Sequence, residues 1–193
     1  MGCYDIRIVK KQFRQSILKK RISLNKTSYK KRSKKIQKNF LAAFPIQTFK
    51  TMGLYMPFNN EVDLKLLIKE NQNYKNTITF PVTKPNGCLE FIAPPDGCDF
   101  RLNQFGILEP TSGKAVPLPQ HDAMIIPAIG ADKNCCRIGF GGGYYDRTFH
   151  ILEDSIYKPI LIGLLFEFQM INKGIGEPHD IKFDFIFSES SES

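Results

Sequence analysis

The strongest constraint on the fold is an uninterrupted apolar run near the C-terminus. Residues 159–166 read Pro-Ile-Leu-Ile-Gly-Leu-Leu-Phe, without one polar or charged side chain. Because the run does not alternate between apolar and polar residues, a strand of this sequence needs apolar partners on both faces. Such a strand belongs inside a parallel sheet with helices on both sides. The run is far shorter than the roughly 18 apolar residues of a membrane span, so no membrane association is expected.

Strand and helix signals alternate along the chain on either side of this run. Short segments rich in β-formers predict further strands at residues 52–56, 77–82, 89–93, 123–127 and 184–187. One helix is expected to start at Asn60, which has Asp63 three residues later, and another is expected to run from about Tyr144 to Leu152. The alternation predicts one domain over residues 1–193, a three-layer α/β/α sandwich around a mixed, mostly parallel sheet.

The N-terminal part of the chain is basic and reads as helical. Residues 1–50 hold fifteen Lys/Arg and one acid, a charge of +14, and the remainder carries −6, which gives the +8 of the whole chain. The helical spacing of Ile6, Val9, Phe13 and Ile17 predicts one amphipathic helix, and Asn25 and Thr27 are candidate N-caps for a second. We expect residues 1–45 to pack on the core and to face an anionic partner, which leaves nucleotide phosphate, a polyglutamate tail and nucleic acid open.

Cysteine usage and the two termini give expectations about the compartment. The five cysteines, at positions 3, 88, 98, 135 and 136, are odd in number and form no C-x-x-C pair, so neither disulfides nor a zinc site is indicated. No apolar segment follows the charged N-terminus, so we expect no secretory signal and a cytoplasmic location. The Ser/Glu-rich tail, residues 188–193, is expected to be frayed.

The segment with the most chemical information is glycine-rich. Residues 137–147 read Arg-Ile-Gly-Phe-Gly-Gly-Gly-Tyr-Tyr-Asp-Arg between an expected strand and an expected helix. Backbone N–H groups of consecutive glycines can bind phosphate, and Asp146 in the first helical turn can cap the helix or hold Mg²⁺. The string is neither a Walker A loop nor G-x-G-x-x-G, so the glycines alone are equally consistent with an ordinary flexible loop.

The whole string closely resembles the signature of the 5-formyltetrahydrofolate cyclo-ligase family. Bacterial members carry Arg-Leu-Gly-Tyr-Gly-Gly-Gly-Tyr-Tyr-Asp-Arg, and this chain differs only by the conservative Ile138 and Phe140. Further blocks resemble the family in the same order, at Lys10 and Arg14, residues 60–63, 105–110, 116–132, 178–180, and Asp184. Two departures concern the substrate pocket, since Lys84 stands where many members have Arg and Cys135-Cys136 replaces a Gly-containing turn.

The resemblance implies an ATP- and Mg²⁺-dependent ligase that converts 5-formyltetrahydrofolate to 5,10-methenyltetrahydrofolate. It implies catalytic roles for Lys10, Arg14 and Arg137. For ATP it implies Lys10, Arg14, Gly139, Gly141, Gly142, Gly143, Tyr144 and Asp146. For the folate it implies Met56, Glu61, Phe105 and Tyr145. Asp146 and Asp180 are the implied metal ligands, with Asp184 as a close rival to Asp180.

Several assignments have a plainer alternative in the residues themselves, and for Glu61 and Asp63 the alternative is that both are helix-capping acids. Lys10 and Arg14 share a helix face that is otherwise typical of solvated charge, and Phe105 is equally consistent with a core position. Tyr144 is expected to pack inward, and His121, His150 and His179 lack metal-ligand spacing. At the level of function, the alternatives are a nucleic-acid-binding module that uses the basic half and a different enzyme on a similar fold. We expect a monomer with small-molecule substrates and no nucleic-acid partner.

Overall fold

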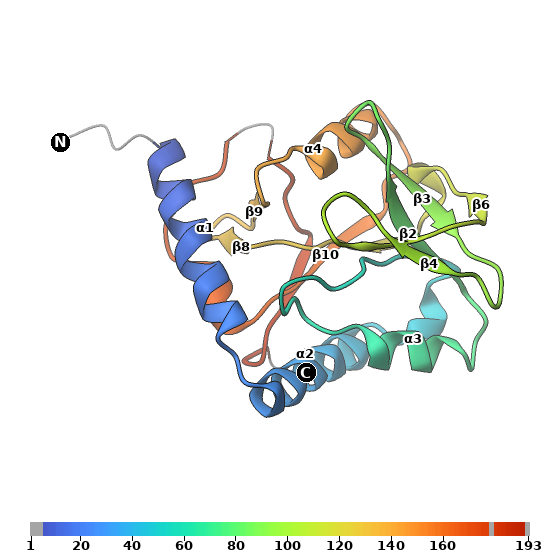
Figure 1. Ribbon diagram of the computed structural model, residues 1–193, viewed down its shortest axis with the longest axis horizontal. Coiled ribbons are helices and arrows are strands. Elements are labelled where there is room, and N and C mark those ends of the chain that lie inside the picture. The colour runs from blue at the N-terminus through green and yellow to red at the C-terminus, as the bar shows by residue number, and fades with distance from the viewer. Residues whose placement is uncertain (1–5, 178–179, 192–193) are drawn as a thin grey trace.

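A seven-stranded mixed sheet forms the centre of the structure, a computed structural model that describes residues 6–177 and 180–191 (Figure 1). The strand order is β12 (Phe185–Phe187), β10 (Ile160–Leu164), β7 (Ala123–Ile125), β1 (Thr51–Gly53), β2 (Thr77–Thr83), β3 (Leu89–Ala93) and β6 (Lys114–Ala115). The first five strands are parallel to one another, and β3 runs antiparallel to both of its neighbours, β2 and β6. The predicted mixed, mostly parallel sheet is confirmed.

Helices cover the sheet on both faces, as the apolar run predicted. Figure 1 shows α2 (Lys26–Ala43) and α3 (Lys65–Asn71) on one side and α4 (Tyr144–Phe149) on the other. The short 3-10 helices η2 (Leu118–Gln120) and η3 (His150–Leu152) pack on the α4 side. Along β10, Ile162 and Leu164 belong to the apolar cluster under α2, and Leu161 belongs to the cluster under α4. The strand therefore buries both faces, which is the arrangement expected for a run without polar positions.

The two N-terminal helices meet the core in different ways. Helix α2 begins at the predicted N-cap, since Asn25 Oδ1 accepts a hydrogen bond from Ser28 N at 2.8 Å. It buries Ile36 and Phe40 completely. Helix α1 (Ile6–Ile22) stands at one end of the molecule, beside β8 (Gly130–Asp132) and β9 (Arg137–Ile138) (Figure 1). Its position brings the basic segment against the glycine-rich loop that follows β9.

The start of α3 differs from the prediction. Asn60 does not cap this helix, because it has a left-handed backbone with φ 55° and its side chain donates to Arg21 O at the end of α1. The helix begins at Lys65, whose N–H group is bonded by Asp63 Oδ1 at 2.7 Å. Asn60 thus links the loop after β1 to α1, while Asp63 forms a local turn just before α3, whose N-cap residue, Leu64, makes no side-chain capping bond.

Short strands that the sequence did not predict build the surroundings of the site. A small sheet contains β11 (Met170–Ile171), β8 and β9, and a separate hairpin pairs β4 (Phe100–Leu102) with β5 (Leu108–Pro110). Two further 3-10 turns, η1 (Ile46–Thr48) and η4 (Glu167–Gln169), complete the described elements. Strands of two or three residues show too little alternation to be recognised from sequence.

The start of the C-terminal tail is held rather than frayed. Asn39 Nδ2 donates to Ser188 O at 2.9 Å, and the Glu189 carboxylate pairs with the Arg32 guanidinium of α2. Residues 192–193 lie outside the described part of the chain. Among the helices of the described residues, none has the length and apolar character needed to cross a bilayer.

Candidate active site

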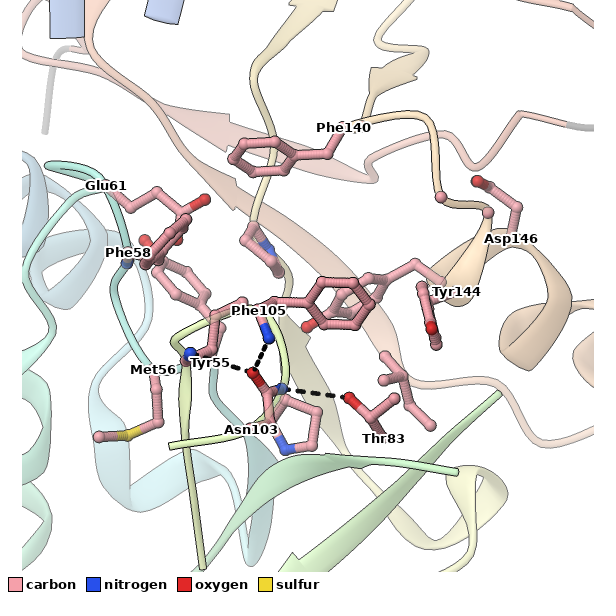
Figure 2. A pocket seen from close by; sticks show the side chains of 18 of the residues that line it. Tyr55, Met56, Phe58, Glu61, Thr83, Asn103, Phe105, Phe140, Tyr144 and Asp146 are labelled. Carbon is pink, nitrogen blue, oxygen red and sulfur yellow. Dashed lines mark hydrogen bonds between the residues drawn. The ribbon is translucent and has the colours of Figure 1, made fainter. Parts of the chain in front are cut away.

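A cavity of about 400 Å³ opens at the carboxyl ends of β1, β2 and β7, where parallel α/β sheets usually bind ligands (Figure 2). The β4–β5 hairpin and the glycine-rich loop form its other walls. Nearly all the residues that the resemblance assigned to catalysis, ATP and folate line this cavity: Met56, Glu61, Phe105, Arg137, Gly139, Gly141, Gly142, Gly143, Tyr144, Tyr145 and Asp146. Residues far apart in the sequence are thus brought together around one cavity.

The glycine-rich loop runs from β9 to α4 in a conformation that only glycine adopts easily. Gly141 has φ 102°, and Gly143, immediately before α4, has φ 70°. Arg147 fixes the loop from the helix side, because its Nη2 donates to Gly142 O at 2.7 Å and to Gly87 O at 2.9 Å. A side chain on Gly143 would collide with Arg147. The loop is therefore tied to the β2–β3 turn through Arg147.

Arg137 is the buried cation of the cavity wall. It is 6% exposed, its Nε donates to Pro127 O at 2.8 Å, and its guanidinium lies 4.7 Å from the Tyr145 ring centroid. Its Nη1 is 3.6 Å from Asp146 Oδ1. Burial lowers the pKa of the Arg137 guanidinium, and the nearby Asp146 carboxylate opposes that shift. A Cβ on Gly139 would lie 2.7 Å from Arg137 Nη1, so glycine is needed there to make room for the guanidinium.

Glu61 is the buried carboxylate of the cavity. Its Oε2 accepts a hydrogen bond from Phe58 N at 3.1 Å, and Arg21 Nη2 lies 3.6 Å from its Oε1. Burial raises the pKa of Glu61 to about 7, although Arg21, the Phe58 N–H group and Arg137 oppose the shift. In Figure 2, Glu61 and Asp146 lie on opposite sides of the cavity, with Phe105 between them. These two carboxylates of the lining therefore lie in different environments, and Glu109 is a third at the base of the hairpin.

The aromatic residues of the cavity are arranged differently from two of the sequence expectations. Phe105 is not a core residue, because 47% of it is exposed at the tip of the β4–β5 hairpin. Its ring makes an edge contact with Tyr144 at 5.6 Å, and the Arg147 guanidinium lies 5.3 Å from the same tyrosine ring. Tyr144 therefore faces the hairpin instead of packing inward. Tyr145, the next residue on α4, is the one that packs on the core, against Phe149 at 5.9 Å.

A polar network holds the hairpin over the cavity. Glu109 Oε1 accepts hydrogen bonds from Thr83 N at 2.9 Å, Thr83 Oγ1 at 2.7 Å and Asn103 Nδ2 at 2.7 Å. Asn103 Oδ1 in turn accepts from Phe105 N at 2.8 Å and Ile107 N at 3.1 Å (Figure 2). Asn103 thus fixes the turn that carries Phe105, and Glu109 anchors that turn to the end of β2.

Lys10, Arg14 and Asp180 lie beside the cavity and are not part of its lining. Lys10 is 5% exposed, so it does not belong to a solvated basic face, and its Nζ contacts Glu177 Oε2 at 2.7 Å and Asp180 Oδ2 at 2.6 Å. Arg14 Nε donates to Gly139 O at 2.7 Å, at the start of the glycine-rich loop. Arg14 therefore touches this loop from α1, while the charge of Lys10 is neutralised by two acids.

The remaining candidates have structural partners. Asp184 Oδ2 accepts from Leu161 N at 2.7 Å near the start of β10, so this rival lies at the amino end of the parallel strands, away from the cavity. His121 is buried and shares a 2.8 Å hydrogen bond with Thr79, and His150 pairs with Glu153 on the surface. His179 and Pro178 lie outside the described residues. Lys84, at the position of the usual Arg, pairs with Glu90 at 3.0 Å.

Sequence reasoning missed several residues of the site. Tyr55, Phe58, Asn103 and Phe140 line the cavity, and Arg21 lies behind Glu61. Phe140 lies within the signature itself, and Asn103 stands two residues before Phe105, so position offered a signal for both. Arg21 had no signal, because it is one of many cations in α1 and α2 and only tertiary packing distinguishes it.

Comparison with known proteins identifies the family. The family model described as 5-formyltetrahydrofolate cyclo-ligase family matches residues 7–189. A 5-formyltetrahydrofolate cyclo-ligase of Haemophilus influenzae is 28% identical over 184 residues, covering 92% of this chain and 96% of the relative. One from Mycoplasma pneumoniae is 29% identical, covering 93% and 98%. The solved structure of the Aquifex aeolicus 5,10-methenyltetrahydrofolate synthetase superposes with a TM-score of 0.80 at 27% identity, covering 94% of this chain and 90% of that one. The chain therefore belongs to the 5-formyltetrahydrofolate cyclo-ligase family.

Proposed function

We propose that the chain converts 5-formyltetrahydrofolate and ATP to 5,10-methenyltetrahydrofolate, ADP and phosphate. One observation carries this proposal beyond the family match: a single cavity is lined by the glycine-rich loop on one side and by Glu61, Met56 and Phe105 on the other. A folate and the terminal phosphate of ATP must meet in one site for this reaction, and the cavity offers walls suited to each.

The chemistry needs activation of a formamide, which is a poor electrophile with a poor leaving group. In the proposed reaction, the formyl oxygen attacks the γ-phosphorus of ATP and ADP leaves. N10 of the same folate then attacks the formyl carbon, loses its proton, and expels phosphate with the former formyl oxygen. No protein nucleophile takes part, so the protein has to align the reacting groups and stabilise the charge of the transferring phosphoryl group.

Arg137 and the glycine-rich loop are proposed to hold the phosphates. The Arg137 guanidinium is already fixed by Pro127 O and the Tyr145 ring, so it can bind phosphate without losing much conformational freedom. Arg14 approaches the loop from α1 and adds a second positive charge. Lys10 is proposed as a third, and its use requires that phosphate replaces the contacts with Glu177 and Asp180.

Asp146 is the proposed ligand of Mg²⁺, with Asp180 as a second acid near it. The described residues contain no group of three or more His, Cys, Asp or Glu side chains that could hold a metal by themselves. Mg²⁺ is commonly held by one or two carboxylates together with phosphates and water, and the half-buried Asp146 in the cavity wall suits that kind of site. When bound with ATP, the ion neutralises phosphate charge and polarises the transferring group.

The folate is proposed to bind between Glu61 and the hairpin. A carboxylate can accept two hydrogen bonds from an aminopyrimidine edge, and Glu61 is the buried carboxylate of this wall. Phe105 offers an exposed ring for stacking, and Met56 and Tyr145 supply apolar surface. We further propose that the enzyme works as a cytoplasmic monomer on these small molecules, without nucleic acid.

The test is a turnover assay. The purified chain is incubated with 5-formyltetrahydrofolate and Mg-ATP, and methenyltetrahydrofolate is followed by its absorbance while ADP is measured in parallel. We expect equal amounts of methenyltetrahydrofolate and ADP, and no product when ATP is replaced by a non-hydrolysable analogue. Absence of product with both substrates present, or product without ADP, would overturn the proposed function.

A further inference from the structure

Arg21 is an arginine with no exposed surface in a helix whose other cations are mostly at the surface. Its Nε donates to Asn59 O at 2.7 Å, its Nη1 to Ala128 O at 3.2 Å and its Nη2 to Phe58 O at 3.4 Å. The two loop carbonyls follow β1, and the third follows β7. One guanidinium therefore joins α1 to the carboxyl ends of two neighbouring strands of the sheet.

The same guanidinium touches two functional walls of the cavity. Its Nη2 lies 3.6 Å from Glu61 Oε1, and its central carbon lies 5.6 Å from the ring centroid of Phe140 in the glycine-rich loop. Arg21 itself is not part of the lining, while Phe58, Glu61 and Phe140 are. Arg21 therefore cannot act on the substrate directly, but it contacts residues of both the folate wall and the phosphate wall.

Stability alone does not account for a charged residue at this position. A buried ion pair loses the hydration of both charges, and apolar residues of similar volume often replace such pairs without loss of stability. The surroundings of Arg21 also require a guanidinium group, because its three nitrogen atoms donate hydrogen bonds to three separate carbonyl oxygens. A lysine ammonium group cannot reproduce this planar arrangement of donors. This arrangement points to positioning of the site.

We infer that Arg21 is a positioning residue for folate binding: it orients the Glu61 carboxylate, favours its ionised form and holds the loop of residues 58–61 at the cavity wall. The inference rests on the proposed function, because it takes Glu61 as the acceptor for the folate. It adds a residue that lies outside the binding surface and acts through Glu61.

The ionisable groups around Glu61 define how Arg21 acts. They come from four elements and the loop after β1: Arg21 of α1, Tyr29 of α2, Tyr55 of the loop, Arg137 of β9 and Tyr145 of α4. Of these, only the two arginines favour the ionised carboxylate, and burial opposes it. Loss of Arg21 therefore raises the pKa of Glu61 further, and a larger fraction of Glu61 is protonated at neutral pH. In the variant without Arg21, folate binding should therefore stay weak up to a higher pH than in the parent protein.

The test compares Arg21→Met and Arg21→Lys with a matched control, Arg32→Met. Arg32 also pairs with a carboxylate, Glu189, and lies over the Phe166 and Phe168 rings, but it is not part of the cavity lining and makes no ion pair with Glu61. For Arg21→Met at pH 7 we expect a folate KM at least tenfold higher, an ATP KM within twofold, and a pH profile of folate KM displaced to higher pH. Arg21→Lys keeps the positive charge but loses the planar guanidinium. We therefore expect a folate KM between those of the parent protein and Arg21→Met, with little change in its pH dependence. Arg32→Met should change neither KM by more than twofold.

A double variant separates positioning from general damage to the structure. In a Glu61→Gln background, Arg21→Met should have less than a threefold effect on folate KM, because the carboxylate through which Arg21 acts is absent. An equal effect in both backgrounds, or equal rises in the KM of folate and ATP, would overturn the inference. If Arg21→Met does not fold, Arg21→Lys is used in its place, and its effects on the folate KM and the ATP KM are compared in the same way. An inactive parent protein would instead refute the proposed function, so the two failures are distinct.

Discussion

Glu61 shows how one buried residue links the site to the pH dependence of stability. Its pKa is about 7 in the folded chain, because burial disfavours the charged form, and lies near the ordinary 4.5 when unfolded. Since the folded state binds this proton more tightly, the contribution of Glu61 to stability falls as pH rises from about 4.5 to 7. Linkage gives a loss of about 3 kcal/mol over that window.

Glu61→Gln tests this linkage, because an amide does not titrate. We expect the melting temperature of the variant, relative to the parent protein, to increase between pH 5 and pH 8. Thermal unfolding at several pH values measures this difference. A difference that stays constant across the range would mean that Glu61 does not titrate near neutrality.

Asp146 is the second residue whose role can be isolated. It is partly exposed, with 29% of the side chain accessible, and its contact with Arg137 spans 3.6 Å. Asp146→Asn should therefore change the melting temperature little and reduce kcat at saturating Mg-ATP by roughly 100-fold, as for other groups that organise transferring charge. The control is Glu153→Gln, which removes a surface carboxylate paired with His150. If Asp146→Asn turns over as fast as the parent protein, Asp146 is not a ligand of the catalytic Mg²⁺.

At the scale of elements, the β4–β5 hairpin is expected to set folate affinity. Asn103 Oδ1 accepts from the N–H group two residues ahead and so fixes the tip that carries Phe105. Asn103→Ala should raise folate KM about tenfold and leave ATP KM within twofold. Asn86 makes the same kind of bond to Cys88 N in the β2–β3 turn, outside the cavity lining, so Asn86→Ala is the matched control. Equal effects of the two variants on folate KM would show that the hairpin has no special role.

The elements also show what sequence patterns can predict. The apolar run at β10 and the β-rich segments at β2 and β3 predicted strands correctly, because periodicity and length distinguish them. The β4–β5 hairpin and the β8–β9 pair were missed, since two- or three-residue strands are defined by tertiary hydrogen bonds. The start of α3 was placed too early because Asn60 bonds the end of α1, a long-range contact that no local capping pattern reveals.

At the scale of the whole molecule, the sheet topology explains how the site is assembled. The loops after β1 and β7 meet at the same edge because those strands are parallel neighbours, and α1 packs over this edge through Arg14 and Arg21. The ordered sequence blocks contain most of the residues that line the cavity, but Lys10, Arg14 and Asp180, which the same blocks assigned to the site, lie outside the lining. The blocks did not predict the buried Lys10 with its two acids, or Arg21 behind Glu61, because the burial of a cation depends on packing partners far along the chain.

The central claim is that the formyl oxygen is phosphorylated within this cavity, and an isotope experiment tests it directly. The enzyme is given 5-formyltetrahydrofolate labelled with ¹⁸O in the formyl group, together with unlabelled Mg-ATP, and the released phosphate is analysed by mass spectrometry. Transfer of the γ-phosphoryl group to the formyl oxygen predicts one ¹⁸O atom in each phosphate released with methenyltetrahydrofolate. Unlabelled phosphate, with the isotope recovered in water, would show that ATP is hydrolysed separately from the cyclisation and would contradict the account.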